Sequence, residues 1–554
     1  MKDNLSKFVL IFIIALASAL RLTGLDTAPI GFNDDESAFG YNAYSVLKTG
    51  RDEWGKLLPF PVFESFGDWK LVGYLYPVVL SEAIFGENEF ATRLPSALFG
   101  IAAVVTTYLL AKKIFDKNVA LVASFLLAIS PWHIIASRNA FESDVLIFFL
   151  TLGTLFFLEG LSRKKFLTFS FIIFGLSLYI YRSSWLFVPV FISSIIFQNR
   201  KTLNNKRSFL IKNILVLVTI ALPLIPTAFS FKGQSRFIQE SFITGVQKSG
   251  IIDNLNQKRG VCQNFQKLPI CSLVLNKYSA FTFNYFANYI ANLSPETYYV
   301  RPTVAAYQGF STRAPFYLFE FPLLIIGLTF FLKQKNPYSK ILIAWILIAP
   351  IGASITGVAN LGRLNIIMPA PQIISAFGLV TALKMLKSRL YKKIIITSFI
   401  TISCVSLLGT TFDLFYYLPQ ISAVNLRYGY KQLFDYLAKE KNGYSQIIVS
   451  RRSDDAKQYI HYLFFEKVDP QEFLNPQVTT RYRDQNGWQV VEKIGNVYFY
   501  QSLPSLENLP PKSLIGVGEI EAIPVESLFT VKDPKGDKIF EVYNLNDKRV
   551  LKNK

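Results

Sequence analysis

The chain has 554 residues, of which 51% are hydrophobic and 15% aromatic, and it carries a formal net charge of +20. Its mean hydropathy of +0.31 indicates a membrane protein rather than a soluble enzyme. The excess positive charge lies mostly in short runs between apolar segments, a pattern typical of cytoplasmic loops, and this argues against nucleic-acid binding.

Eleven apolar runs are candidates for membrane-spanning helices, since about 20 helical residues cross a bilayer. The runs lie at 7–24, 91–113, 119–137, 143–161, 166–182, 183–198, 208–230, 315–333, 339–357, 364–386 and 393–415. Lysines and arginines cluster in alternate connections, which the positive-inside rule places in the cytoplasm. We therefore expect a multi-pass protein of the cell membrane with a cytoplasmic N-terminus. Residues 25–90 and 231–314 would be extracytoplasmic loops.

Residues 71–86 are apolar enough to span, but a crossing there would invert every later loop. We expect a helix that begins at Lys70 and lies in the membrane interface, with Tyr74 and Tyr76 among the headgroups.

The long loop 231–314 exceeds the length of a plain connection, so we expect it to contain helices and to serve in binding. Its Cys262 and Cys271 would pair in an oxidising compartment, and the sequence leaves open whether they do.

The chain changes character near residue 418. Residues 1–418 carry the apolar runs, whereas residues 419–554 are predicted to form a small extracytoplasmic α/β domain. Within it a helical pattern at 430–437 precedes strand patterns at 446–450, 488–492, 497–500, 529–532 and 538–543.

Three consecutive acids, Asp34, Asp35 and Glu36, follow the first apolar run. Carboxylates this close to a bilayer are rare, which favours a functional site. One of them can act as a general base by accepting the proton of an attacking hydroxyl. The competing interpretation is a solvated acidic turn at the start of a helix, and spacing alone does not separate the two.

Five cations fall on the outer side of the predicted topology, where orientation does not require positive charge. They are Lys70, Arg93, Arg138, Arg182 and Arg363. Any single one is best explained as reaching toward lipid headgroups. Together, opposite the acids, they indicate a phosphate site, because fixed cations stabilise the charge that a leaving phosphate gains.

Glu142 and Asp144 begin the fourth apolar run, where they orient Arg138 or Lys70, contact substrate, or form a structural ion pair. His133, beside Trp132, is interpreted as an interfacial residue. The sequence has no His/Cys cluster with metal spacing, no phosphate-binding glycine loop and no nucleophile elbow. No cofactor is required by the sequence, and the need for a divalent metal is left open. A substrate activated in advance and delivered in the membrane fits this pattern.

Several short motifs occur in a characteristic order along the chain: Asp35-Glu36 after the first run, Lys70, Phe85–Ser96 with Arg93, Ser137-Arg138 with Asp144, and Arg363-Leu364-Asn365 before Pro369. With these motifs the chain resembles glycosyltransferase family 39, the group of protein O-mannosyltransferases and lipid A aminoarabinose transferases. The resemblance covers roughly residues 5–415 and is strongest over 20–162.

This resemblance implies the C-type glycosyltransferase fold, an α-helical polytopic membrane protein with about 11 transmembrane helices, here with the added α/β domain. It also implies a polyprenyl-phosphate sugar donor and inversion at the anomeric carbon. The implied roles are catalysis for Asp35 as base with Glu36, donor phosphate binding for Lys70, Arg363 and Arg138, and support of the pocket for Asp34, Arg93, Asp144, Arg182 and Asn365.

Two features depart from the family pattern. Asn33-Asp34 precedes the Asp-Glu pair, so Asp34 and Asp35 both remain candidates for the base. Gly67-Asp68-Trp69-Lys70 replaces the His-Pro-Pro element found near the lysine in many mannosyltransferases, which weakens the case for protein mannosylation in particular.

The predicted function is transfer of a sugar from a polyprenyl phosphate to an extracytoplasmic acceptor, which is a protein, a lipid or a cell-surface glycan. One alternative is an oligosaccharide transferase or polymer ligase, which the mass of the product would distinguish. The other is a lipid or solute transporter, for which internal repeats and polar residues at mid-membrane are expected.

Overall fold

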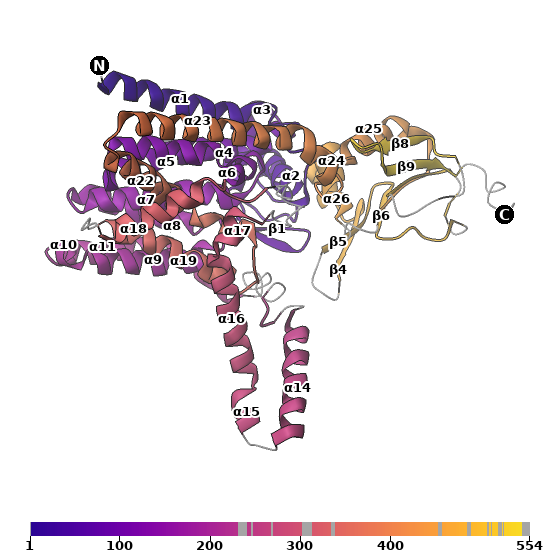
Figure 1. Cartoon of the computed structure of the whole chain (residues 1–554). Helices are drawn as coiled ribbons and strands as arrows, with labels where there is room; N and C mark the ends of the chain where they lie inside the picture. Colours follow the sequence, from indigo (N-terminus) through magenta and orange to yellow (C-terminus); the bar gives the residue numbers. More distant parts are fainter. Residues whose placement is uncertain are drawn as a thin grey trace.

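The computed structural model describes residues 2–230, 241–244, 247–266, 270–301, 313–333, 338–451, 457–484, 489–506, 509–510, 512–518, 523 and 526–545. A helical body makes up most of the molecule, a sheet domain sits at one end of its long helices, and a helical arm projects from its side (Figure 1).

The body is built from long apolar helices and shorter segments that join them. Its helices are α1 (Lys2–Leu22), α2 (Asp34–Thr49), α3 (Leu75–Phe85), α4 (Glu89–Ile114), α5 (Lys117–Ile129), α6 (Pro131–Arg138), α7 (Glu142–Gly160), α8 (Lys164–Ser177), α9 (Ser184–Gln198), α10 (Arg200–Asn204), α11 (Arg207–Ala221), α12 (Leu224–Phe229), α18 (Glu320–Lys333), α19 (Ser339–Ile348), α20 (Pro350–Ala353), α21 (Leu361–Leu364), η2 (Asn365–Ile367), α22 (Ala370–Met385), α23 (Arg389–Phe412), η3 (Asp413–Tyr417) and α24 (Leu418–Ser422).

Four helices in the described part of the chain are long and apolar enough to cross a membrane. They cover residues 4–22, 89–114, 142–160 and 389–422. Two further pairs, α5 with α6 and α21–η2 with α22, are bent by 57° and 47° and raise the number to six if each pair is one span. Helices also occupy the other predicted runs, but α8, α9, α11, α18 and α19 have only 10 to 15 residues. The body is therefore mostly helical with candidate spans, and eleven crossings stay a prediction.

A short antiparallel hairpin, β1 (Val62–Ser65) and β2 (Asp68–Leu71), lies buried between α2 and α3. Its two-residue turn has positive φ at both Phe66 (43°) and Gly67 (86°), the conformation that matches the twist of paired strands. The prediction that Lys70 begins an interfacial helix was wrong, because Lys70 lies in β2 and the helix starts at Leu75.

Tyr74 is also misplaced by the sequence interpretation. It is fully buried, and its hydroxyl donates a hydrogen bond to the Thr92 carbonyl at 2.7 Å, so it does not reach the headgroups.

The C-terminal domain contains a seven-stranded sheet in the order β4-β5-β6-β3-β7-β9-β8. Its strands are β3 (Gln446–Ser450), β4 (Thr479–Arg483), β5 (Gln489–Ile494), β6 (Val497–Tyr500), β7 (Ser513–Gly518), β8 (Phe529–Lys532) and β9 (Lys538–Asn544), and its helices are α25 (Tyr430–Glu440), η4 (Lys441–Gly443), α26 (Gln458–Phe465) and α27 (Pro470–Leu474). β3 is parallel to both β6 and β7, whereas the remaining pairings are antiparallel. The strands predicted at 446–450, 497–500, 529–532 and 538–543 are confirmed.

The sheet domain is packed directly against α2. Phe464 of α26 stacks on Phe32 with ring centroids 4.6 Å apart. Gly40 of α2 lets that ring approach closely, since a Cβ there would come within 2.3 Å of Phe464. The acidic N-terminus of α2 thereby lies between the body and the C-terminal domain.

The arm is formed by α14 (Gln247–Gln266), α15 (Ile270–Val274) and α16 (Lys277–Leu293), and α17 (Pro295–Tyr299) leads back to the body. The expectation of helices in the long loop is thus confirmed. A disulfide joins Cys262, near the end of α14, to Cys271 of the short helix α15, which answers the question left open by the sequence.

Candidate active site

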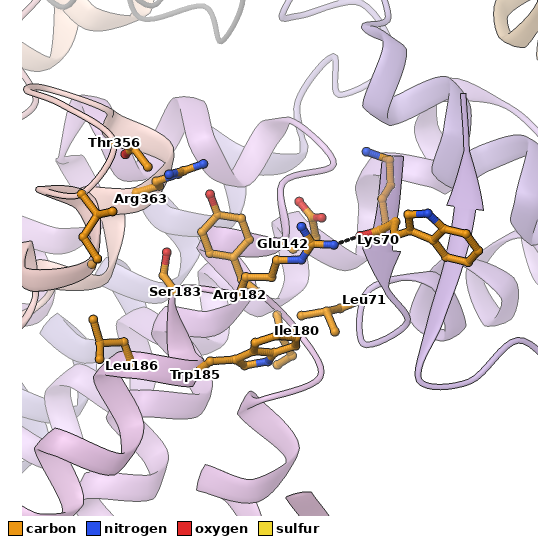
Figure 2. A pocket seen from close by; sticks show the side chains of 14 residues that line it. Lys70, Leu71, Glu142, Ile180, Arg182, Ser183, Trp185, Leu186, Thr356 and Arg363 are labelled. Carbon is orange, nitrogen blue, oxygen red and sulfur yellow. Dashed lines mark hydrogen bonds between the residues drawn. The ribbon is translucent and has the colours of Figure 1, made fainter. Parts of the chain in front are cut away.

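A cavity of about 220 Å³ opens where β2, the start of α7, the residues before α9 and the α20–α21 segment meet. It is lined by Trp69, Lys70, Leu71, Glu142, Ile180, Tyr181, Arg182, Ser183, Trp185, Leu186, Gly352, Ile355, Thr356 and Arg363. Arg182 and Glu142 lie between Lys70 on one wall and Arg363 on the other (Figure 2). The structure therefore brings three of the five predicted cations to one cavity.

Lys70 connects this cavity to the acids of α2. Its ammonium pairs with the carboxylate of Asp35 and also donates to Asp68 Oδ2 at 2.9 Å. The Lys70 side chain is 1% exposed, whereas that of Asp35 is 37% exposed. Phe66 lies below the ammonium at 5.0 Å from the ring centroid. A buried lysine thus faces the cavity while an accessible carboxylate lies beside it.

Arg182 precedes α9, and its guanidinium donates a hydrogen bond to the Trp69 carbonyl of β2. This contact fixes the loop before α9 against the strand that carries Lys70. Guanidinium groups bind phosphate oxygens in pairs, and Arg182 and Arg363 both face the cavity. The arrangement can hold an anion between an ammonium and two guanidinium groups.

Asp34 has a different environment from Asp35. Arg427 donates to both of its oxygens at 2.9 and 3.1 Å, His461 Nε2 lies 3.0 Å from Oδ1, and Lys457 lies 3.7 Å from Oδ2. Burial alone would raise the pKa of the Asp34 carboxyl, but these three partners outweigh burial and hold that pKa well below its usual range. Asp34 therefore ties α2 to the C-terminal domain, which favours Asp35 as the base.

Glu36, predicted to be catalytic beside Asp35, lies in a closed environment. Its side chain is 1% exposed and pairs with Arg93 Nε at 2.7 Å. It also accepts hydrogen bonds from the backbone amides of Asn33 and Ala140, each at 3.1 Å. These contacts enclose the carboxylate and give Glu36 a structural role in joining α2 to α4.

Arg93 shares that tie and does not line the cavity. Its guanidinium also donates to the carbonyls of Leu25, Pro29 and Gly31 at 3.1, 3.1 and 2.6 Å. The buried ion pair between Glu36 and Arg93 thus holds the segment that joins α1 to α2 against α4.

Arg138 was predicted to bind the donor phosphate, but it is fully buried and lies outside the cavity. Its three nitrogens donate to the carbonyls of Leu20, Thr23, Gly24 and Ala28 at 2.8 to 3.0 Å. These contacts anchor the end of α1 and engage the whole guanidinium, so a phosphate role for Arg138 is not supported.

Asp144 and Asn365 lie in a second buried cluster. Asp144 Oδ1 is 3.7 Å from His133 Nε2, and Arg21 contacts the other ring nitrogen of His133 at 2.5 Å. The expectation that Asp144 orients Arg138 or Lys70 is not met, and His133 is buried rather than interfacial. Both Asp144 and Asn365 support the packing of the body beside the cavity, not its lining.

Sequence reasoning missed several cavity residues, notably Tyr181, Ser183 and Trp185. The signal available was the stretch Tyr181-Arg182-Ser183-Ser184-Trp185, which interrupts two apolar runs with polar and aromatic residues. Among the described residues, no group of three or more His, Cys, Asp or Glu side chains is arranged to hold a metal ion.

The fold is that of the C-type membrane glycosyltransferases. ArnT from Cupriavidus metallidurans in the apo state aligns over 98% of this chain and 98% of its own, with a TM-score of 0.55 and 12% sequence identity. The structure of ArnT bound to undecaprenyl phosphate aligns over the same shares with a TM-score of 0.50.

Sequence comparison provides a second indication of the family. Residues 72–226 match the family model described as dolichyl-phosphate-mannose-protein mannosyltransferase. The putative mannosyltransferase YkcB of Bacillus subtilis is 29% identical over 151 residues, 26% of this chain and 21% of the relative. An uncharacterized protein of Aquifex aeolicus is 31% identical over 163 residues, 29% of this chain and 31% of the relative. The chain thus matches between a fifth and a third of these relatives' length. Together the matches and the fold indicate a family 39-like C-type glycosyltransferase, which confirms the resemblance drawn from the sequence.

Proposed function

We propose that this chain transfers one sugar from a polyprenyl phosphate to an extracytoplasmic acceptor, with inversion at the anomeric carbon. The observation that carries the proposal is the cavity in which Lys70, Arg182 and Arg363 meet, with Asp35 paired to Lys70. The names of the relatives support sugar transfer, since one is a putative mannosyltransferase, and a structural neighbour binds undecaprenyl phosphate.

In the proposed reaction an oxygen of the acceptor attacks the anomeric carbon as the bond from that carbon to the phosphate oxygen breaks. The bonding electrons leave with the phosphate. Lys70, Arg182 and Arg363 stabilise the charge that develops on it, which is where fixed cations lower a barrier most. Asp35 accepts the proton that the acceptor hydroxyl releases.

The ion pair between Asp35 and Lys70 physically connects the proposed base with a group that binds the leaving phosphate. A phosphate that enters the cavity competes with Asp35 for the ammonium. Binding of the donor would then release the carboxylate toward the acceptor, so the base becomes available when the leaving group is in place.

The transfer reaction would take place at the extracytoplasmic surface of the membrane. The β1–β2 hairpin, whose residues 69–71 line the cavity, lies at the end of the body where α2 and the sheet domain are packed (Figure 1). The basic loops predict that this end is extracytoplasmic.

The test uses the full chain reconstituted in vesicles with radiolabelled polyprenyl-phosphate mannose as the probe. We expect release of polyprenyl phosphate and transfer of label to a membrane or protein acceptor. A product heavier by many sugars would favour the polymer ligase. Label that crosses the vesicle membrane without any covalent product would favour the transporter and contradict the proposal.

A further inference from the structure

The β1–β2 hairpin takes its position from the structure around it. Each strand has four residues, and a two-stranded hairpin by itself is only marginally stable. Its turn residue Phe66 has φ of 43°, a backbone conformation that a bulky side chain keeps only where its neighbours hold it. On the side of the body, Arg182 donates to the Trp69 carbonyl. Because Lys70 belongs to the same hairpin, the contacts that hold the hairpin also decide where the Lys70 ammonium lies.

The C-terminal domain holds the turn of this hairpin through Tyr459 of α26. The Tyr459 hydroxyl accepts a hydrogen bond from the Phe66 amide at 2.9 Å and donates to Glu53 Oε1 at 3.0 Å. Glu53 also accepts from Ser65 of β1 at 3.1 Å and from Asn42 of α2 at 2.8 Å. All five residues are buried. One hydroxyl therefore joins the C-terminal domain both to the turn and to the network that ties β1 to α2.

A second set of contacts holds strand β1. The edge of the sheet domain that carries β4 and β5 lies beside this strand (Figure 1). Glu64 of β1 accepts from Arg483 of β4 at 2.8 Å and from Gln489 of β5 at 3.1 Å. In the hairpin register Glu64 is opposite Trp69, the neighbour of Lys70. The C-terminal domain thus holds the hairpin at two separate points, its turn and its first strand.

Two groups that contact the Lys70 ammonium belong to the turn or follow it directly. Lys70 Nζ lies 5.0 Å from the centroid of the Phe66 ring and 2.9 Å from Asp68 Oδ2. Asp68 is the first residue of β2, directly after the two turn residues. A displacement of the turn would therefore shift both neighbours of the ammonium. Misplacement of a catalytic group by about 1 Å can lower a rate by about 10²-fold, so the position of Lys70 matters for a phosphate site.

We propose that Tyr459 is a positioning residue for Lys70, and that the C-terminal domain thereby sets the affinity of the cavity for the donor phosphate. The inference rests on the proposed function, in which Lys70 binds that phosphate. Without the Tyr459 hydroxyl, the Phe66 amide would lose its hydrogen-bond acceptor, the turn would relax, and Lys70 would be less well placed. The C-terminal domain would then be part of the donor site, although the described lining of the cavity comes from residues 69–363.

The experiment measures the Kd of the full chain for undecaprenyl phosphate by native mass spectrometry, so that binding is followed without the transfer step. Tyr459→Phe keeps the aromatic ring and removes only the hydroxyl. The matched control is Tyr462→Phe, the same substitution one turn later in α26, where the ring contacts Phe434 and Phe499 within the C-terminal domain. Thermal unfolding in detergent checks that each variant is folded.

We expect Tyr459→Phe to raise the Kd by about two- to tenfold, the range that one hydrogen bond contributes to an equilibrium. Tyr462→Phe should leave the Kd unchanged. In a Lys70→Ala background Tyr459→Phe should have no further effect, because residues that act through one another are not additive. Arg483→Gln, which loosens the second contact, should show the same pattern, and Arg483→Lys should recover part of the affinity.

Two results would overturn the inference while leaving the proposed function in place. One is a parental Kd in both Tyr459→Phe and Arg483→Gln although Lys70→Ala weakens binding. The other is an equal loss on Tyr459→Phe with and without Lys70, which would show that the hydroxyl does not act through the lysine. A parental Kd in Lys70→Ala itself would instead remove the proposed phosphate site, and this inference with it.

Discussion

The carboxylate of Asp35 pairs with the ammonium of Lys70 where the N-terminus of α2 meets the β1–β2 hairpin. Lys70 also lines the cavity that Arg182 and Arg363 share. In this arrangement a proton acceptor and an anion site have one side chain in common. The predictions for Asp35 and Lys70 follow from it and can be separated by experiment.

Asp35→Asn should reduce transfer by about 100-fold or more, because general-base catalysis contributes about 10²- to 10⁴-fold. Donor binding should stay the same or tighten, because the neutral amide competes less than the carboxylate with the phosphate for the Lys70 ammonium. The measurement is turnover of polyprenyl-phosphate mannose in vesicles, with thermal unfolding in detergent as the check on folding. Parental turnover in a folded Asp35→Asn protein would show that another group takes the proton.

Lys70→Ala and Arg363→Ala should each raise the KM for the lipid donor by about tenfold or more, since a hydrogen bond between charged groups contributes about 1.5–3 kcal/mol. Lys70→Arg should recover part of the lost affinity. Binding of polyprenyl phosphate itself, followed by native mass spectrometry, separates donor affinity from the chemical step. Unchanged affinity in both alanine variants would place the phosphate elsewhere.

Glu36→Gln should destabilise the protein by about 3–5 kcal/mol, because it leaves Arg93 as a buried charge without its carboxylate. The matched control is Glu296→Gln, which removes an ion pair whose side chains are 51% and 69% exposed. That substitution should cost less than about 1 kcal/mol. Comparable losses in urea unfolding of the two variants would argue against the structural role assigned to Glu36.

Asp34→Asn should loosen the contact between the C-terminal domain and α2. The pKa of the Asp34 carboxyl is held low, so its contribution is complete above about pH 4 and is lost only as pH falls toward the folded pKa. At neutral pH the variant should therefore show faster proteolysis in the segment between α24 and α25. A cleavage rate equal to that of the parent protein would show that Phe464 and its neighbours hold the domain without this carboxylate.

Glu53 should make stability depend on pH in the opposite sense. Burial raises the pKa of Glu53 to about 8, although Asn42, Tyr459 and Ser65 donate to it. The unfolded chain loses this proton first, so the stability should fall from about pH 4.5 to about pH 8 and level off above, with a slope of at most about 1.4 kcal/mol per pH unit. Glu53→Gln should remove that slope in unfolding measured from pH 5 to 8.

Residue type and order along the chain predict much of the fold and part of the candidate site. The acidic stretch, the outer cations and the strands at 446–450 and 538–543 could be identified because charge and alternation are local properties. The sequence also contained the motifs of family 39 in order. It could not rank the charges, since Asp35 and Glu36 are neighbours of the same class and differ only in what encloses them.

Burial also separates Arg138 from the cations of the cavity. Its partners are backbone carbonyls at the end of α1, and a carbonyl has no signature in a sequence. The β1–β2 hairpin was not predicted, because its strands have only four residues each. Arg427 and His461 could not be linked to Asp34, since a contact between residues so far apart depends on how α26 packs on α2.

The partners of Asp34 have a consequence for biogenesis. Asp34 is synthesised before its partners Arg427 and His461, which follow it by 393 and 427 residues. During translation the acidic first turn of α2 therefore lacks these two partners until the C-terminal domain has been made. A nascent chain halted before residue 427 would keep the Asp35–Lys70 pair but would lack the contacts that hold Asp34 at the first turn of α2.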